Sequence, residues 1–225
     1  MMSEIIQRNG ITTIAEPGFP NINFENELAL LKYEMEKKPP YSVYLIPNAA
    51  SLEIAKKSRQ ETLEFINSLT KFDTRNIKFL NEQIKIFADG AIYSQAMQVS
   101  DGYNNSSEGK WMTPPAYLSD LFQFYWREKF KLHIHANGDK AIAHLLNLVD
   151  ESNKAFPRKD HNTTLHHMGY FTDSLAERIK NLGAEASINP YYLWALSDKY
   201  TESGLGAQRA QNLVTANSLA RRDIN

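Results

Sequence analysis

The chain has 225 residues, of which 42% are hydrophobic and 23% charged, and its formal net charge is −1 at pH 7. These values are ordinary for one globular domain, and the lack of long basic runs argues against nucleic-acid binding. The absence of cysteine excludes disulfides and thiolate metal ligands. We find no apolar run of membrane-spanning length and no pattern of a secretory signal, so the localisation stays open, with the cytoplasm slightly favoured.

Helix-like and strand-like segments alternate along the chain. Residues 2–9 are typical of the last turns of a helix that ends at Gly10. Strands are predicted at residues 11–16, 41–46, 83–87, 132–135, 163–167 and 184–188. Helices are predicted at residues 25–36, 52–69, 114–129, 140–153, 172–182 and 207–221, with a long polar loop at 89–113.

The regular alternation predicts an α/β fold with a parallel sheet, because parallel strands need crossover connections that are usually helices. The predicted helix at 140–153 carries an apolar stripe at helical spacing, formed by Ala141, Ile142, Leu145, Leu146 and Val149. Two arrangements remain open, a barrel and an open doubly wound sheet. No glycine-rich nucleotide motif follows any strand, and this weakens the second arrangement.

Polar residues gather at the carboxyl ends of three consecutive predicted strands. Active sites of parallel α/β proteins form at these ends, so the cluster is the candidate site. Its members are Lys85, Asp89, His133, His135, His166 and His167.

Spacing constrains where these side chains point. His133 and His135 are two residues apart on a strand and therefore face the same side. By itself such a pair binds a metal in roughly one case in three, and packing is the ordinary alternative. The adjacent His166 and His167 should point to opposite faces, so at most one of them should join His135. Lys85 lies in an apolar strand, where its amine either reaches the strand end or is converted by CO2 to a carbamate.

Several motifs then resemble one known family in the right order. They are GITTIAEPG, IKIFADGA, LHIHANGDKAI, TLHHMGYF with the helix and ASINP that follow, and LGAQRAQNLVTANSL. With them the sequence resembles the amidohydrolase superfamily, and within it amidohydrolase family 3, which includes N-substituted formamide deformylases and proteins named exoenzyme regulatory protein. The HANGD segment with the following HH pair is the most specific of these matches.

The resemblance implies a metal-dependent hydrolase with a (β/α)8 barrel that cleaves carbon–nitrogen bonds in small, non-peptide amides. It implies His135, His167 and Lys85 as metal ligands, with Lys85 carboxylated in members that bridge two metals. One or two divalent ions are expected, zinc first of all. Asp89, His133 and His166 remain candidates for the substrate pocket, and Asp139 is expected to cap its helix.

Two elements of the family pattern fall outside the sequence. The His-x-His pair of the first barrel strand is expected before Met1, and the general-base aspartate of the last strand after Asn225. Residues 1–225 are therefore expected to be the central, six-stranded part of a catalytic barrel, inactive by itself and without a catalytic residue of its own. Its uncovered edge strands, at 11–16 and 184–188, are expected to form a homo-oligomer. A truncated homologue that binds a ligand or partner without catalysis is the alternative.

Overall fold

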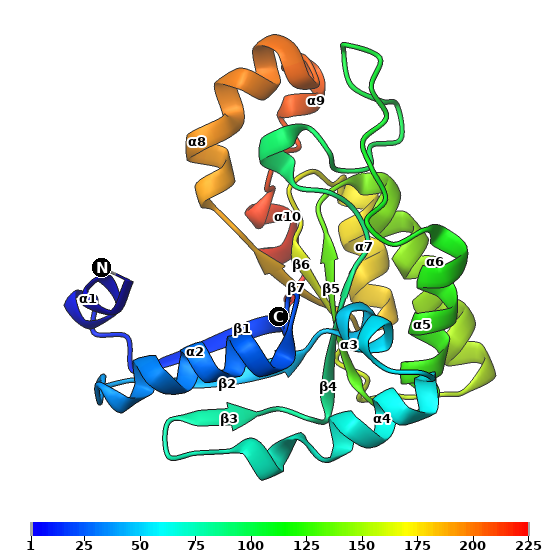
Figure 1. The fold of residues 1–225 in the computed structure, drawn as a ribbon. Coiled ribbons are helices and arrows are strands. Elements are labelled where there is room, and N and C mark those ends of the chain that lie inside the picture. The colour runs from blue at the N-terminus through cyan, green and yellow to red at the C-terminus, as the bar shows by residue number, and fades with distance from the viewer. Residues whose placement is uncertain (1, 225) are drawn as a thin grey trace. The chain divides into compact units, whose positions relative to one another are not determined.

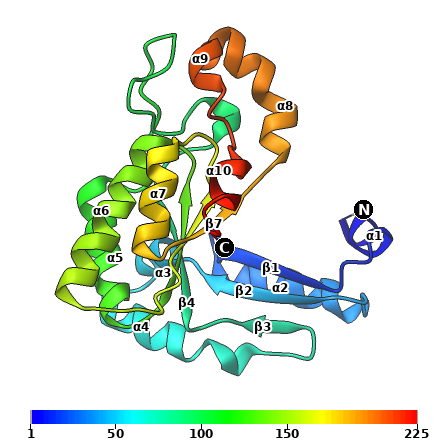
Figure 2. The same cartoon turned by 180° about the vertical axis from the view of Figure 1, so that it is seen from behind.

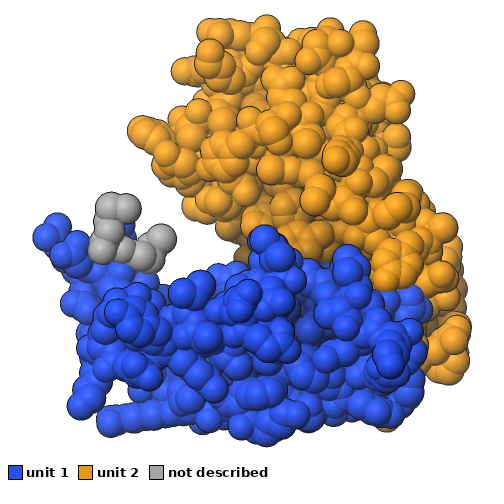
Figure 3. Space-filling model, in the orientation of Figure 1, with its two compact units in different colours: residues 1–86 blue, residues 87–225 orange. Residues whose placement is uncertain are grey.

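The structure, a computed structural model, describes residues 2–224. The chain divides into two compact units, residues 1–86 and residues 87–225, which are described separately (Figure 3). Among the described residues, no helix combines the length and the apolar character needed to cross a membrane.

The first unit is built on three parallel strands in the order β1-β2-β3 (Figure 1). They are β1 (Thr13–Phe19), β2 (Ser42–Pro47) and β3 (Ile77–Phe79). The helices are α1 (Met2–Arg8), α2 (Phe24–Glu36), α3 (Ala49–Ala55) and α4 (Arg59–Asn67), followed by a 3-10 turn at Leu69–Phe72. Strand β4 (Gln83–Phe87) runs across the boundary between the units.

An aromatic cluster holds the helices of the first unit against its sheet. Phe24, at the start of α2, meets Phe65 of α4 edge-on at a centroid distance of 5.0 Å. It also meets Phe19 of β1 at 5.8 Å. Such perpendicular pairs add to the energy of area burial. This cluster therefore packs α2 and α4 against strand β1.

The second unit contains the parallel strands β5 (Lys131–Ala136), β6 (Thr164–His167) and β7 (Glu185–Ile188). The helices α5 (Pro115–Arg127), α6 (Asp139–Ala155) and α7 (Asp173–Leu182) lie side by side along one face of these strands, as Figures 1 and 2 show. Leu132, Ile134 and Leu165 are fully buried on that face. The opposite face of β5 and β6 carries the histidines.

The predicted apolar stripe of α6 is confirmed, since all five of its residues are fully buried. Helix α7 ends where Gly183 adopts φ +69, a left-handed conformation that favours glycine. Thr172 precedes α7 as its N-cap residue, but its side chain bonds to Ser174 rather than to the helix backbone.

A second, smaller core covers the end of this unit beyond the strands. The loop after β4, with a 3-10 turn at Ile92–Ser94, packs against α8 (Tyr191–Lys199) and a π-helical turn at Tyr200–Gly204. The Tyr200 hydroxyl donates to the carbonyl of Ile92 at 2.6 Å. Several apolar residues of the segment predicted as a polar loop, among them Ile92, Met97 and Val99, are thus buried. Helix α8 occupies a segment for which no helix was predicted.

Two predicted helices are interrupted. The segment 52–69 contains α3 and α4, because the Ser58 side chain accepts a hydrogen bond from the Glu61 N–H and so starts a new helix. The segment 207–221 contains two short helices, α9 (Ala207–Ala210) and α10 (Ala216–Ala220). Between them Leu213 and Val214 turn into the second core. The described residues form seven strands where six were predicted, since β3 was missed.

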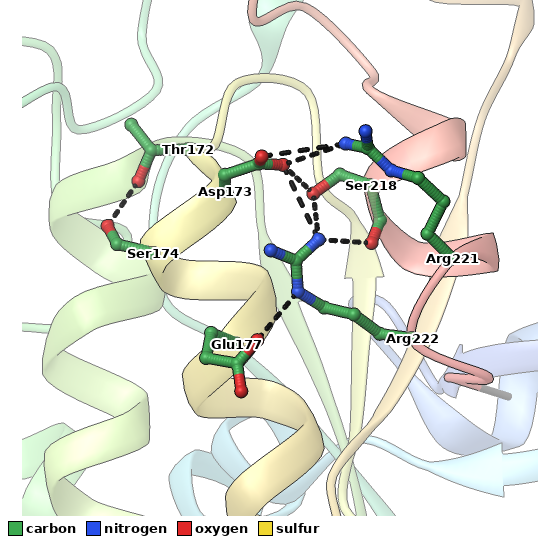
Figure 4. Close-up of polar contacts among 7 residues, drawn as sticks. All are labelled: Thr172, Asp173, Ser174, Glu177, Ser218, Arg221 and Arg222. Atoms are coloured by element: carbon green, nitrogen blue, oxygen red, sulfur yellow. Dashed lines mark hydrogen bonds and ion pairs between the residues drawn. The ribbon is translucent and has the colours of Figure 1, made fainter.

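Polar contacts attach α10 to α7 (Figure 4). The Asp173 carboxylate accepts a hydrogen bond from Ser218 and faces the guanidinium groups of Arg221 and Arg222. Arg222 also bonds to Glu177 at 2.9 Å. The hydrogen bond from Ser218, followed by the two arginines, lowers the pKa of the exposed Asp173 carboxyl. These contacts fix the last described helix on the outside of the second unit.

Replacing Arg158 with alanine is expected to lower the free energy of unfolding by about 2 kcal/mol, the usual scale for hydrogen bonds to a charged group. Its guanidinium donates hydrogen bonds to the backbone carbonyls of Trp126, Lys129 and Phe130, at and just after the C-terminal end of α5. It also lies 5.0 Å from the centroid of the Trp126 ring. Denaturant unfolding measures the loss. Arg158→Lys keeps the charge without the forked donor and should recover less than half of it; full recovery would contradict this role.

Candidate functional site

Four imidazole rings meet on the face of β5 and β6 opposite the helices. His133 Nδ1 lies 2.8 Å from His166 Nε2, so these two rings share a hydrogen bond. The rings of His135 and His167 approach with a centroid distance of 4.4 Å. The strand register explains the proximity, because it pairs His135 with His166 and Ala136 with His167.

The adjacent histidines do not separate as strand alternation predicts. His166 contacts His133, while His167 contacts His135, which is on the same face. The reason is local backbone conformation: His167 has φ +78 and Met168 has φ +41. The regular strand ends there, and the left-handed turn directs the His167 ring toward His135. Both rings therefore lie on the face of His133 and His135, which corrects the expectation that they point to opposite faces.

Each of the two closest rings has a polar neighbour on one nitrogen. The Asn137 side-chain amide donates to the Gly90 carbonyl at 3.2 Å, and the same nitrogen lies 2.9 Å from His135 Nε2. On the other ring, the Tyr192 hydroxyl lies 3.3 Å from His167 Nδ1. In metal-binding histidines, the ring nitrogen that does not bind the metal usually has a hydrogen-bond partner that orients the ring. Neither Asn137 nor Tyr192 was among the residues singled out from sequence.

Asp89 is fully buried and supports the turn between β5 and α6. Its carboxylate accepts hydrogen bonds from the backbone N–H groups of Gln98, Asn137 and Gly138 at 2.8 to 2.9 Å. Burial raises the pKa of this carboxyl to about 7, against the opposing effect of the N–H donors. One oxygen lies 3.9 Å from His135 Nε2. These contacts give Asp89 a structural role beside the imidazoles.

The same turn allows no side chain at Gly138, because a Cβ there would lie 2.0 Å from the carbonyl oxygen of Gln98. Asp139 follows as the first residue of α6. Its carboxylate accepts the N–H groups of Ser100 and Lys140, both at 2.9 Å. Asp139 therefore stabilises the start of its helix, as expected, but Gly138 occupies the N-cap position itself.

Lys85 belongs to the first unit and is buried in β4 between the fully buried Ile84 and Ile86. Its backbone forms a parallel bridge with Asn48. Burial lowers the pKa of its ammonium to about 7, and the negative charge of Glu16 partly opposes this. Near neutral pH a substantial share of the side chain is then a neutral amine, the form that reacts with CO2. The expected convergence of Lys85 with His135 and His167 stays a prediction.

The donor set fits a metal only in part. A catalytic zinc takes three protein ligands and a water. Within residues 2–224, no group of three or more His, Asp or Glu side chains is arranged to hold a metal ion. His135 and His167 are the candidate ligands whose rings lie closest together, and we call this pair the half-site.

A hollow of about 940 Å³ lies elsewhere, in the first unit. Thr12, Ser42 and Ile77 line it where β1, β2 and β3 begin, together with Lys32, Lys38 and Arg75. Sites in barrels of parallel strands form at the opposite, carboxyl ends. We therefore do not assign the chemistry to this hollow.

Comparison with known proteins settles the family. Residues 4–225 match the amidohydrolase family, within it family 3. The chain belongs to the amidohydrolase family. Nothing among curated proteins matches it.

Solved structures show the same fold as this amidohydrolase chain. An uncharacterized metal-dependent hydrolase from Pyrococcus furiosus matches with a TM-score of 0.70 and 21% identity, over 97% of this chain and 42% of that one. One from Pyrococcus horikoshii OT3 gives 0.69 and 19%, over 97% and 41%. A triazine hydrolase variant gives 0.51 and 10%, over 98% and 44%. The chain thus spans about two fifths of the length of the metal-dependent hydrolases that it matches.

Proposed function

We propose that this chain forms the central part of the (β/α)8-type barrel of a metal-dependent hydrolase that acts on carbon–nitrogen bonds of small, non-peptide amides. The observation that carries the proposal is the convergence of His135 and His167 at the ends of adjacent parallel strands. It also supports the barrel over the open doubly wound sheet, the other arrangement that the sequence left open. Family membership supplies the reaction class.

His135 and His167 would hold one divalent ion, with zinc the first candidate because it readily accepts imidazole nitrogen. When bound, such an ion activates water and polarises a carbonyl. The chain's own residues orient the two rings: Asn137 contacts His135 and Tyr192 contacts His167. Asp89 fixes the backbone of the Asn137 turn. His133 and His166 would line the substrate side, and a carboxylated Lys85 would be the third ligand.

The second candidate is a homologue that binds a ligand or partner without catalysis. Turnover of small amides in excess zinc distinguishes this candidate from an active enzyme. Self-association through the edge strands β1 and β7 stays a prediction.

Zinc titration followed by calorimetry tests the half-site. We expect weak binding that leaves substoichiometric zinc after dialysis, because two protein ligands give limited chelation. His135→Ala and His167→Ala should each weaken it by about tenfold or more, the scale seen when a metal site is perturbed. His144→Gln, in α6, is the matched control and should bind zinc as the unaltered chain does. Binding that survives both alanine substitutions would refute the assignment.

A further inference from the structure

Tyr192 is held rigidly at the start of α8. Its side chain is 6% exposed and belongs to the second core of the unit. The ring of Tyr93 packs edge-on against it with a centroid distance of 5.4 Å. From this fixed position its hydroxyl reaches Nδ1 of His167, 3.3 Å away. Tyr192 of α8 is therefore part of the second core and also contacts the imidazole cluster through its hydroxyl.

His167 needs such support because its backbone is strained. A non-glycine residue at φ +78 is uncommon, and the next residue, Met168, is also left-handed at φ +41. Backbone bonds hold the peptide on both sides, from Met168 N–H to the Ala136 carbonyl and from Asn189 N–H to the His167 carbonyl. They fix the backbone, and contacts of the side chain orient the ring. One of these contacts is the Tyr192 hydroxyl at Nδ1.

We propose that Tyr192 is a positioning residue for His167: its phenolic oxygen accepts a hydrogen bond from Nδ1–H, which leaves the lone pair of His167 on Nε2 for a metal ligand bond. The inference rests on the proposed function for the identity of that ligand. A histidine that ligates through one nitrogen needs a proton, and a partner for it, on the other. A phenol is neutral near pH 7, and its oxygen has a lone pair that can accept this bond.

The tautomer of His167 tests the proposal without any metal. Two-bond proton–nitrogen NMR spectra of the full chain, at a pH where imidazole is neutral, report which ring nitrogen carries the proton; His167→Gln assigns the signal. We expect Nδ1–H in the unaltered chain. Tyr192→Phe keeps the buried ring but removes the oxygen, and should shift His167 toward the Nε2–H form that neutral histidine favours in water. Tyr191→Phe, at the exposed neighbouring position, should change nothing.

Two results would overturn the proposal: an Nε2–H tautomer in the unaltered chain, or an Nδ1–H tautomer that persists in Tyr192→Phe. Circular dichroism and thermal unfolding of each variant confirm that the fold is kept. Zinc titration adds a separate readout, with affinity expected to fall about tenfold in Tyr192→Phe, the lower end for lost support of a ligand. If the unaltered chain binds no zinc, the proposed metal half-site fails, while the spectra still decide the role of Tyr192.

Discussion

Asp89→Ala is expected to lower the free energy of unfolding by about 4 kcal/mol, because three buried backbone N–H groups lose their acceptor and each such loss costs roughly 1–3 kcal/mol. Those donors are the N–H groups of Gln98, Asn137 and Gly138. The loop around Gln98 and the turn before α6 would separate. Urea unfolding at constant pH, followed by fluorescence and circular dichroism, measures the effect.

Asp139→Ala is the matched control, since that carboxylate lies on the same turn but is more exposed and accepts two backbone N–H groups. We expect it to cost about 1 kcal/mol, the usual value for a helix-terminal contact. Asp89→Asn retains one acceptor oxygen and should fall between the two. If Asp89→Ala proves no more harmful than Asp139→Ala, the carboxylate is not what holds this turn.

Lys85→Met is expected to stabilise the chain at neutral pH and to remove part of its pH dependence. Burial lowers the pKa of Lys85 from 10.5 to about 7 in the folded chain. Between these values the unfolded chain binds the extra proton, so the stability of the unaltered chain rises as pH rises from about 7 toward 10.5. The full change amounts to about 4–5 kcal/mol. An apolar methionine avoids the cost of a buried ammonium ion.

Unfolding free energies at pH 6, 7.5 and 9 measure this effect. Between pH 7.5 and 9, above the pKa of about 7 of Asp89, the stability of Lys85→Met should rise less than that of the unaltered chain. Lys78→Met, which replaces a half-exposed side chain on strand β3, is the matched control and should keep the original dependence. Equal slopes for the unaltered chain and Lys85→Met would contradict a buried amine that titrates near neutrality. A carbamate signal with 13C-labelled bicarbonate, absent in Lys85→Met, would support the carboxylated form.

Several features of the fold follow from short-range sequence patterns. The α6 stripe and the glycine that ends α7 could be predicted because helix periodicity and left-handed glycine are local properties. Strand β4 was predicted with its observed bounds, Gln83–Phe87, since polar and apolar residues alternate over its first four positions. The break before α4 could also have been found, because Ser58 and Glu61 have the spacing of a capping box.

Other features depend on contacts between distant segments. Helix α8 has little amphipathic pattern and follows a proline, yet it forms because Tyr192 and Tyr200 are buried against the loop after β4. That burial also interrupts the helix predicted at 207–221, where Leu213 and Val214 enter the same core. No local pattern in either segment indicates these partners, which lie about a hundred residues earlier in the chain.

The sequence by itself determined the family and the alternation of helices and parallel strands. It also placed four histidines at strand ends, namely His133, His135, His166 and His167. These features could be read because motif order and strand periodicity are properties of short sequence segments. Only the tertiary structure decided which rings meet. Strand alternation places His167 on the helix side, but a left-handed backbone at His167 and Met168 directs its ring toward His135. Such strain persists only where surrounding contacts compensate for it, and here these come from β5, the segment after β7 and the second core.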